Sequence, residues 1–321
     1  MGTLLEVRNL KKYFQVPKGY LHAVDDVSFK INEGETLGIV GESGCGKSTL
    51  GRAILRLHEP TSGTVLFDGM NVTGMDKQEM RSLRKYMQII FQDPYASLNP
   101  RFTVAQIIEE PLRLHKIYSS EAEIQARVEE LMDMVGLSAR MQNAYPHEFD
   151  GGRRQRIVIA RALAVNPRFI VCDEPVSALD VSIQAQILNL MIDLQKDLNL
   201  TYIFISHNLS VVKHISTDVG VMYLGQLIEK APKSMIYKNP LHPYTIALLN
   251  AIPSLNPEAR RERQILKGEL TSPVNPKPGC RFSARCPFAQ ERCFAVNPVM
   301  KEVEPGHFVA CHRITKNTGI E

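Results

Sequence analysis

A glycine-rich loop in the first part of the chain could bind phosphates. Residues 41–48 read GESGCGKS, which fits the pattern G-x-x-x-x-G-K-[ST] in full. In this pattern backbone N–H groups surround the phosphates, the lysine contacts the β- and γ-phosphates, and the serine binds Mg²⁺. A strand-like run, residues 36–40, precedes the loop and a run with helical spacing, residues 49–57, follows it. The sequence therefore predicts a nucleoside triphosphate site made by Gly41, Ser43, Gly44, Cys45, Gly46, Lys47, Ser48 and Thr49.

Two adjacent acids later in the chain could complete this site. Asp173 and Glu174 directly follow an apolar, strand-like run, residues 168–172. A carboxylate at a strand end can hold Mg²⁺ through water, and the acid after it can act as a general base on the attacking water. A solvated turn is the alternative for such a pair. The complete phosphate loop favours the chemical interpretation.

A third stretch, residues 148–156, reads EFDGGRRQR and raises a question about charge. Two glycines at the start of a helix often mark backbone that approaches a phosphate closely, yet the residue before them, Asp150, is an anion. Asp150 is also a good N-cap, so it could simply start the helix. Arg153 and Arg154 could draw its carboxylate aside. Helix capping and proximity to a phosphate both remain open.

These residues need a framework of alternating strands and helices. Strand-like runs occupy residues 4–10, 24–31, 36–40, 63–69, 168–173, 200–205 and 219–230. Runs with helical spacing occupy residues 49–57, 104–114, 124–135, 157–165 and 181–195. Ser120 and Glu123 form a capping box before the third of these helices, and Gly136 is placed to end it. The alternation predicts an α/β fold with a largely parallel core sheet and one nucleotide module.

Composition restricts the class of protein further. The chain has 321 residues, of which 44% are hydrophobic, so it can bury a substantial core. A formal charge of +4 is too small to indicate a nucleic-acid partner. No apolar run reaches the roughly 18 residues that cross a bilayer, and the first residues lack the pattern of a signal peptide. We expect a cytosolic protein with at most a peripheral membrane role.

Cysteines gather in the C-terminal part of the chain, where four of the six are separated by five, six and seventeen residues. Disulfides are rare in the cytosol, and these spacings differ from the CxxC pairs of common zinc ribbons. Four thiolates suit an iron–sulfur cluster. The alternatives are free thiols or structural Zn²⁺, in which His307 or His312 could replace a cysteine. The four candidates are Cys280, Cys286, Cys293 and Cys311.

The chain resembles the ATPase domains of ABC transporters. Five motifs occur in the order of that family across residues 5–230: GESGCGKST, the Gln92 motif IIFQDP, the GGRRQR helix start, CDEPVSALD, and ISHN with His207. The resemblance implies a P-loop ABC ATPase domain with a mixed sheet core and a helical subdomain at about residues 93–163. It implies that Gln92 senses Mg²⁺ and signals to a membrane partner, and that His207 contacts the γ-phosphate. It also assigns subunit contacts to the D-loop, Ser177, Ala178, Leu179 and Asp180.

The same resemblance implies an aromatic residue that stacks on the adenine, ahead of the first hairpin. Phe14 occupies the matching position, and Tyr13 is next to it. In a strand these two side chains point to opposite faces, so only one of them can stack on the base. We favour Phe14, and a plain core role is the alternative.

Further stretches are similar to one branch of the family, the peptide and nickel importers. FQDPYASLNPR, NPLHPYTIALLNAIP and the cysteine-rich tail carry this likeness, which covers almost the whole chain. The chain looks most like the second of two different ATPases in an oligopeptide or dipeptide importer. In that branch the four tail cysteines are associated with a [4Fe–4S] cluster; Zn²⁺ is the alternative. Eleven of the 19 prolines also follow Ala231, and we expect an ATP-binding domain at residues 1–232 and a C-terminal domain at 233–321.

The branch implies a definite set of partners. These are a second, different ATPase subunit, two transmembrane permeases and an extracytoplasmic peptide-binding protein, with the chain on the cytoplasmic face of the cell membrane. ATP and Mg²⁺ are the expected cofactors. The rivals are a soluble ABC ATPase that acts on ribosomes or DNA, which usually has two ATP modules, and an iron–sulfur sensor. The cargo could equally be nickel or glutathione.

One motif departs from the family pattern. The usual signature LSGGQ, which faces the ATP held by the opposite subunit, reads FDGGR at residues 149–153. A carboxylate about 4 Å from a phosphate charge is unfavourable by roughly 1 kcal/mol in water and about 4 kcal/mol near a protein surface. We therefore expect two unequal ATP sites, with the partner's site the slower. The residues facing that site are Asp150, Gly151, Gly152 and Arg153.

Overall fold

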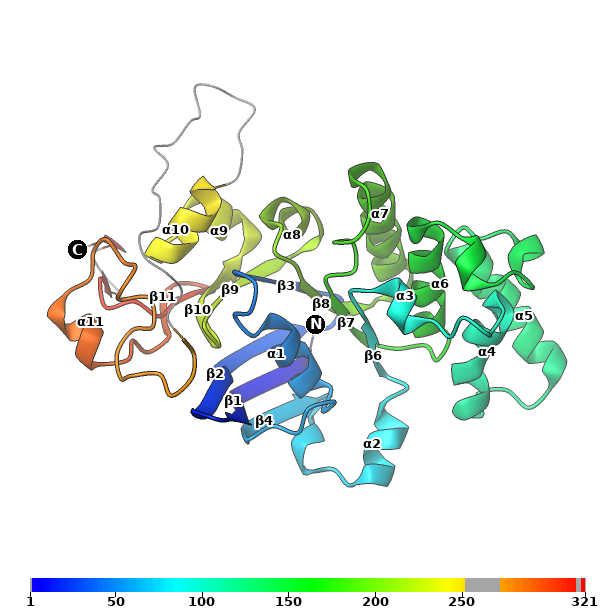
Figure 1. Ribbon diagram of the computed structural model, residues 1–321, viewed down its shortest axis with the longest axis horizontal. Helices are drawn as coiled ribbons and strands as arrows, with labels where there is room; N and C mark the ends of the chain where they lie inside the picture. Colours follow the sequence, from blue (N-terminus) through cyan, green and yellow to red (C-terminus); the bar gives the residue numbers. More distant parts are fainter. Residues whose placement is uncertain (1, 252–271, 316–318, 321) are drawn as a thin grey trace. The chain divides into compact units, whose positions relative to one another are not determined.

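The computed structural model describes residues 2–251, 272–315 and 319–320 (Figure 1). The chain forms two compact units. Unit 1 contains Asn32–Glu35 and Gly74–Phe204. Unit 2 contains Thr3–Ile31, Thr36–Thr73 and the described residues from Ile205 onward. The expected division at residue 232 stays a prediction. The phosphate loop and the described residues after Pro232 belong to the same unit.

Unit 2 contains a four-stranded sheet in the order β2-β1-β4-β5. The bounds are β1 Thr3–Val16, β2 Gly19–Asn32, β4 Ser62–Phe67 and β5 Met70–Asn71. β1 and β4 are antiparallel, and their register pairs Leu5 with Phe67 and Val7 with Val65, all buried. Alternating apolar residues give this sheet one buried face, which explains why three of its strands are recognisable in the sequence.

The second sheet of unit 2 contains the strands β11-β12-β10-β9-β3 in that order. Its bounds are β3 Thr36–Val40, β9 Asp218–Tyr223, β10 Gln226–Pro232, β11 Lys301–Glu304 and β12 His307–Val309. β3 and β9 are parallel, whereas β9, β10, β12 and β11 are antiparallel neighbours. The C-terminal segment, which means here the described residues after Pro232, thus contributes the strands β11 and β12 to the sheet that carries the phosphate loop.

Short helices complete unit 2. They are α1 Lys47–Ile54, α8 Leu209–Ile215, α9 Lys233–Lys238, α10 Pro243–Asn250 and α11 Glu291–Ala295, with a small pair of strands, β13 Ile314–Thr315 and β14 Gly319–Ile320. Of the peptide-importer stretch at residues 239–253, the last two residues lie outside the described residues. The 3₁₀ turn η1, Val72–Gly74, ends the unit's N-terminal part.

Unit 1 contains three adjacent strands and a group of helices. The strands are β6 Met87–Ile90, β7 Phe169–Asp173 and β8 Thr201–Ile205, whose last residue is counted in unit 2; β6 and β7 are parallel. The helices are α2 Lys77–Leu83, α3 Pro94–Ser97, α4 Val104–Leu114, α5 Glu121–Met134, α6 Gly151–Leu163 and α7 Val181–Leu198. Single 3₁₀ turns are η2 Ala139–Met141 and η3 Pro146–Glu148.

The expected helical subdomain corresponds to α3–α6, which pack on one another (Figure 1). The capping box of Ser120 and Glu123 starts α5 as predicted. Gly136 follows that helix with a φ of 69°, a conformation in which glycine avoids the strain of a side chain. Within residues 2–251, 272–315 and 319–320, no helix combines the length and apolar character needed to span a bilayer.

Candidate nucleotide site

The phosphate loop joins β3 to α1 in unit 2. All five residues of β3 are buried, which fixes the point where the loop begins. Gly46 has a φ of 103°, and a Cβ there would lie 1.9 Å from the carbonyl oxygen of Ala23. The loop must therefore have glycine at this position. Lys47, the first residue of α1, is buried and donates hydrogen bonds to the carbonyl oxygens of Gly41, at 2.8 Å, and Glu42, at 3.0 Å.

The remaining residues of the phosphate loop differ in their exposure to solvent. Ser43 and Gly44 are exposed, and a Cβ on Gly44 would meet no atom within 4 Å, so the backbone there is open to a ligand. Ser48 and Thr49 are half-buried in the first turn of α1. Cys45 is buried, and burial raises the pKa of its thiol, so it packs as an apolar residue. The loop backbone, Lys47 and Ser48 stay the predicted groups for binding phosphate and Mg²⁺.

The catalytic acids predicted from the sequence lie at the end of β7 in unit 1. Asp173 is the last residue of the strand and is buried, while Glu174 is half-buried with a φ of 51°. A left-handed conformation at a residue other than glycine is strained, and such strain concentrates at functional sites. This conformation turns the chain directly after Asp173.

Gln92 comes together with Glu174 because their strands are parallel neighbours. The register pairs Ile90 with Cys172, so the residues two positions further on leave the sheet side by side. The Gln92 amide, Nε2, donates to Glu174 Oε2 at 3.1 Å. Gln92 is exposed and Glu174 is half-buried.

The structure answers the question about Asp150. It is the N-cap of α6: its side chain accepts a hydrogen bond from the Arg153 N–H at 2.8 Å, and its other oxygen lies 3.6 Å from Arg153 Nη1. We expected Arg154 as well as Arg153 to draw the Asp150 carboxylate aside, but Arg154 has other partners. Its guanidinium is buried, donates to the Pro146 carbonyl at 2.6 Å and lies 3.6 Å from the ring centre of Tyr95.

The two glycines that follow Asp150 have a structural reason of their own. A Cβ on Gly152 would lie 2.6 Å from Cγ2 of Ile183, a residue of α7, and one on Gly151 would lie 3.0 Å from Cδ2 of Leu179. The glycines therefore allow α6 to approach the D-loop, residues 177–180, and the helix after it. Asp180 is the N-cap residue of α7 by position, without a side-chain cap hydrogen bond.

His207 follows β8 and is exposed, in a bend that leads to α8. Its neighbour Asn208 caps that helix by accepting from the backbone N–H groups of Ser210, at 2.9 Å, and Val211, at 3.4 Å. The cap fixes the bend, so His207 stands at a defined position beyond the carboxyl end of a buried strand.

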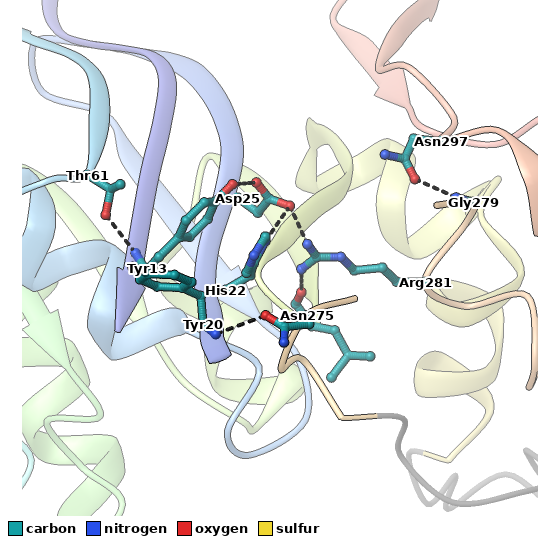
Figure 2. A network of polar contacts seen from close by, with 10 residues as sticks. Tyr13, Tyr20, His22, Asp25, Thr61, Asn275, Gly279, Arg281 and Asn297 are labelled. Carbon is teal, nitrogen blue, oxygen red and sulfur yellow. Dashed lines mark hydrogen bonds and ion pairs between the residues drawn. The ribbon is translucent and has the colours of Figure 1, made fainter. Parts of the chain in front are cut away.

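The aromatic candidates have different environments. The Tyr13 ring stacks on His22 with 3.8 Å between ring centres, and its hydroxyl hydrogen-bonds the carboxylate of Asp25 (Figure 2). Phe14 is half-buried and makes an edge contact with His58 at 5.5 Å between ring centres. Lys12 Nζ also lies over the Phe14 ring, 4.8 Å from its centre, so both aromatic rings have internal contacts. The preference for Phe14 at the adenine stays a prediction.

The four C-terminal cysteines lie near one another but do not form a site for a single ion. Burial, with smaller contributions from the neighbouring thiols of Cys311, Cys293 and Cys286, raises the pKa of Cys280 to about 11. Cys280 N–H donates to the carbonyl of Cys293 at 2.7 Å. Among the residues that the structure describes, no three His, Cys, Asp or Glu side chains are placed to share a metal ion. The expectation of a metal site is therefore unsupported by the geometry.

Sequence reasoning missed the residues that contact the phosphate loop from the C-terminal segment. Glu42, inside the loop pattern but at one of its variable positions, pairs with Arg285 at 3.0 Å. Its backbone N–H donates to the hydroxyl of Tyr244 at 3.0 Å. These partners are 243 and 202 residues away along the chain, and no local pattern could have revealed them.

Comparison with known proteins gives consistent matches. A family model described as "ABC transporter" matches residues 24–177, and one described as "Oligopeptide/dipeptide transporter, C-terminal region" matches residues 228–293. The oligopeptide transport ATP-binding protein AppF of Bacillus subtilis (strain 168) is 55% identical over 97% of each chain. OppF, an oligopeptide transport ATP-binding protein of the same strain, is 53% identical over 96% of each.

Solved structures agree with these matches. A dimeric ATP-binding cassette in a post-hydrolysis state, bound to ADP and Pi, is 29% identical with a TM-score of 0.66. The match covers 72% of this chain and 99% of that one. The core of the chain therefore has the fold of that cassette.

Proposed function

The chain belongs to the ATP-binding subunits of ABC transporters, in the oligopeptide and dipeptide branch, and on this premise we propose that it hydrolyses ATP to drive peptide import. The observation that carries the proposal is the 55% identity that extends over 97% of this chain and of a relative named for oligopeptide transport. It covers both the nucleotide-binding part and the C-terminal segment.

We assign ATP binding to the phosphate loop and hydrolysis to the residues after β7. Lys47 and the backbone from Gly41 to Thr49 bind the phosphates, and Ser48 with Asp173 holds Mg²⁺. Glu174 takes a proton from the attacking water, whose oxygen bonds to the γ-phosphorus as the bond to the β-phosphate oxygen breaks. ADP and phosphate are the products. The buried lysine and the strained backbone at Glu174 support these assignments.

Further roles follow for residues around the nucleotide. Gln92 reports on Mg²⁺ and water through its contact with Glu174, and His207 contacts the γ-phosphate. Phe14 stacks on the adenine. Ser177, Ala178, Leu179 and Asp180 contact the opposite ATPase subunit. Support for a dimer comes from the dimeric cassette that shares this fold.

The proposed partners are membrane proteins. ATP hydrolysis can drive import only when the ATPase acts on proteins that cross the membrane, and no described helix of this chain can do so. We therefore place the chain on the cytoplasmic face of the cell membrane with two permeases and a second, different ATPase. An extracytoplasmic peptide-binding protein delivers the cargo. The relatives' names favour oligopeptides over nickel or glutathione.

The altered signature supports two unequal ATP sites. The site on this chain's phosphate loop, closed by the partner's signature, turns over. The site on the partner's loop is closed by Asp150, Gly151, Gly152 and Arg153 and hydrolyses ATP slowly. Asp150 is 61% exposed at its side chain, so its charge can face a phosphate even while it caps α6.

We also propose that the C-terminal cysteines hold a [4Fe–4S] cluster. Cys280 and Cys293 are joined by a backbone hydrogen bond of 2.7 Å, and neighbouring thiols help to raise the pKa of Cys280 and Cys311. Such a group of thiols suits a multi-iron cluster, whose ligands stand farther apart than those of one ion. The donors would be Cys280, Cys286, Cys293 and Cys311. Such a cluster would supply a cationic core that stabilises the thiolates and fixes the tail, and Zn²⁺ is the alternative.

The function is tested by reconstituting the chain in liposomes with two permeases, the second ATPase and the binding protein. We expect ATP hydrolysis that increases when a peptide is added with the binding protein, and accumulation of labelled peptide inside. Capture of ribosomes instead of membrane proteins, with no peptide uptake, would overturn the proposal.

A further inference from the structure

Glu42 in the phosphate loop is held by the C-terminal segment. Its carboxylate accepts two hydrogen bonds from Arg285 Nη1, at 3.0 and 3.2 Å, and its N–H donates to the Tyr244 hydroxyl. Its carbonyl oxygen accepts from Lys47. The carboxylate, the N–H and the carbonyl oxygen of Glu42 are thus all hydrogen-bonded. Arg285 and Tyr244, both in the C-terminal segment, are the partners of the first two groups. The shape of the loop at Glu42 depends on this segment.

Arg285 also neutralises the only acid between Gly41 and Thr49. The side chains of Arg285 and Glu42 are 10% and 24% exposed, so solvent screens this pair less than an ordinary surface pair. An unpaired carboxylate in the loop would repel the phosphates that the loop binds. Charge neutralisation by Arg285 therefore favours binding of a triphosphate.

A second arginine of the same segment supports the far end of the loop. Arg281 donates to the carbonyl of Leu224 and pairs with Asp25, which also accepts from Tyr13 (Figure 2). The next residue, Gly225, donates its N–H to the carbonyl of Cys45 at 2.8 Å. Arg281 thus holds the turn at Leu224 and Gly225, which hydrogen-bonds the phosphate loop at Cys45. Arg285 holds the loop itself at Glu42.

Packing makes the segment a rigid support. Phe282, between the two arginines, is 1% exposed. Its ring contacts those of Tyr223 and Tyr244, with 5.3 and 5.5 Å between ring centres. Tyr223 is the last residue of β9, so the segment is anchored to the sheet from which the phosphate loop emerges.

We propose that residues 281–285 are a built-in regulator of nucleotide affinity, in which Arg285 is a positioning residue that holds and neutralises Glu42. The inference rests on the proposed ATP site. The C-terminal segment thereby sets how tightly the chain binds ATP.

The test measures dissociation constants of Mg-ATP and AMP for the purified full-length chain by calorimetry. Arg285→Gln should weaken ATP binding about five- to tenfold, because one charge pair is lost. AMP binding should change less than about twofold, since AMP lacks the β- and γ-phosphates. Arg285→Lys should retain most of the affinity. Arg292→Gln, an exposed arginine of α11, is the matched control.

Charge removal on the other partner separates positioning from a loss of folding. Glu42→Gln combined with Arg285→Gln should restore ATP affinity to within about twofold of the original chain, because no unpaired charge remains. Tyr244→Phe, which removes the hydroxyl that accepts from Glu42, should weaken ATP binding without any change of charge. Thermal unfolding of each variant shows whether it is folded.

Two results would overturn the inference. One is an Arg285→Gln chain that is folded and binds ATP as tightly as the original. The other is a double variant as weak as the single one. If the original chain itself fails to bind ATP, the proposed function fails instead. If Arg285→Gln does not fold, unchanged ATP affinity in Tyr244→Phe decides against the inference.

Discussion

Gln92 donates a hydrogen bond from its side-chain amide to the carboxylate of Glu174, across 3.1 Å. The pairing follows from two parallel strands, β6 and β7, whose ends carry the two residues to the same edge. A residue that follows one strand can therefore report directly on the state of the acid that follows the other. This relationship makes Glu174 the most informative position for mutation.

Glu174→Gln should leave ATP binding intact and reduce turnover about 10²- to 10⁴-fold, the usual contribution of a general base. The amide keeps the size of the side chain and can still accept from Gln92. ATPase rates of the assembled transporter, together with ATP affinity of the isolated chain, measure both effects. Glu129→Gln, the same change on the exposed face of α5, should be silent. Near-normal turnover in Glu174→Gln would show that another group is the base.

Loss of catalysis should differ between the two ATP sites of the complex. Glu174→Gln should remove most ATPase activity, whereas removal of the partner's catalytic glutamate should remove little, because Asp150 disfavours turnover in the partner's site. Asp150→Ser, which keeps an N-cap but removes the charge, should raise the contribution of that site. ATPase rates of matched complexes measure this. Equal losses from the two glutamate variants would show that the sites are equivalent.

Gly152→Ala should destabilise the chain by about 1–2 kcal/mol, because the new methyl group would lie 2.6 Å from Cγ2 of Ile183. Ile183→Ala removes that methyl, so the double variant should recover stability beyond the sum of the singles. Gly151→Ala is the matched control, since it meets only the flexible end of Leu179 at 3.0 Å. Urea unfolding measures the effect. Equal stability of the two alanine variants would contradict the packing argument.

The full chain purified without oxygen should be brown and contain about four irons. Cys286→Ser with Cys311→Ser should abolish the iron, and Cys172→Ala, at a buried cysteine of β7, should not. Elemental analysis and the visible absorption spectrum measure both. One zinc and no iron per chain would identify the alternative metal, and neither metal would leave four free thiols.

Stability should fall in mild acid because of His242. Burial lowers the pKa of this side chain from 6.5 to about 4, and the Glu229 carboxylate only partly opposes the shift. Since the unfolded chain binds the proton more readily, the stabilisation is complete above pH 6.5 and is lost as the pH falls toward 4. His242→Asn can still accept from the Tyr244 N–H, as the Nδ1 of His242 does at 3.1 Å.

The melting temperature of the original chain should therefore fall more steeply between pH 6.5 and 4.5 than that of His242→Asn. Differential scanning calorimetry over this range gives the two slopes. Parallel slopes would assign the acid sensitivity to other groups.

Local patterns were sufficient to predict the elements that carry the chemistry. The phosphate loop, the capping box at Ser120 and the N-cap at Asp150 depend on residues within a few positions of each other. Gly152 shows the limit of prediction from local patterns. The sequence indicates that the backbone at Gly152 closely approaches another group, but only the structure identifies Ile183 as that neighbour. The pairing of Glu42 with Arg285 was invisible, because neither residue has a distinctive local setting.

The pairing of β10 with β12 has a consequence for solubility. β12 hydrogen-bonds β10 at Glu229 and Lys230, and the outer strand β11 presents the exposed charges of Lys301 and Glu302. Without these two strands, β10 would be an open edge with unpaired backbone groups, a template for pairing with other chains. A shortened ATPase ending after β10 should therefore self-associate, however intact its catalytic residues. The charged border at β11 keeps the sheet from growing between molecules.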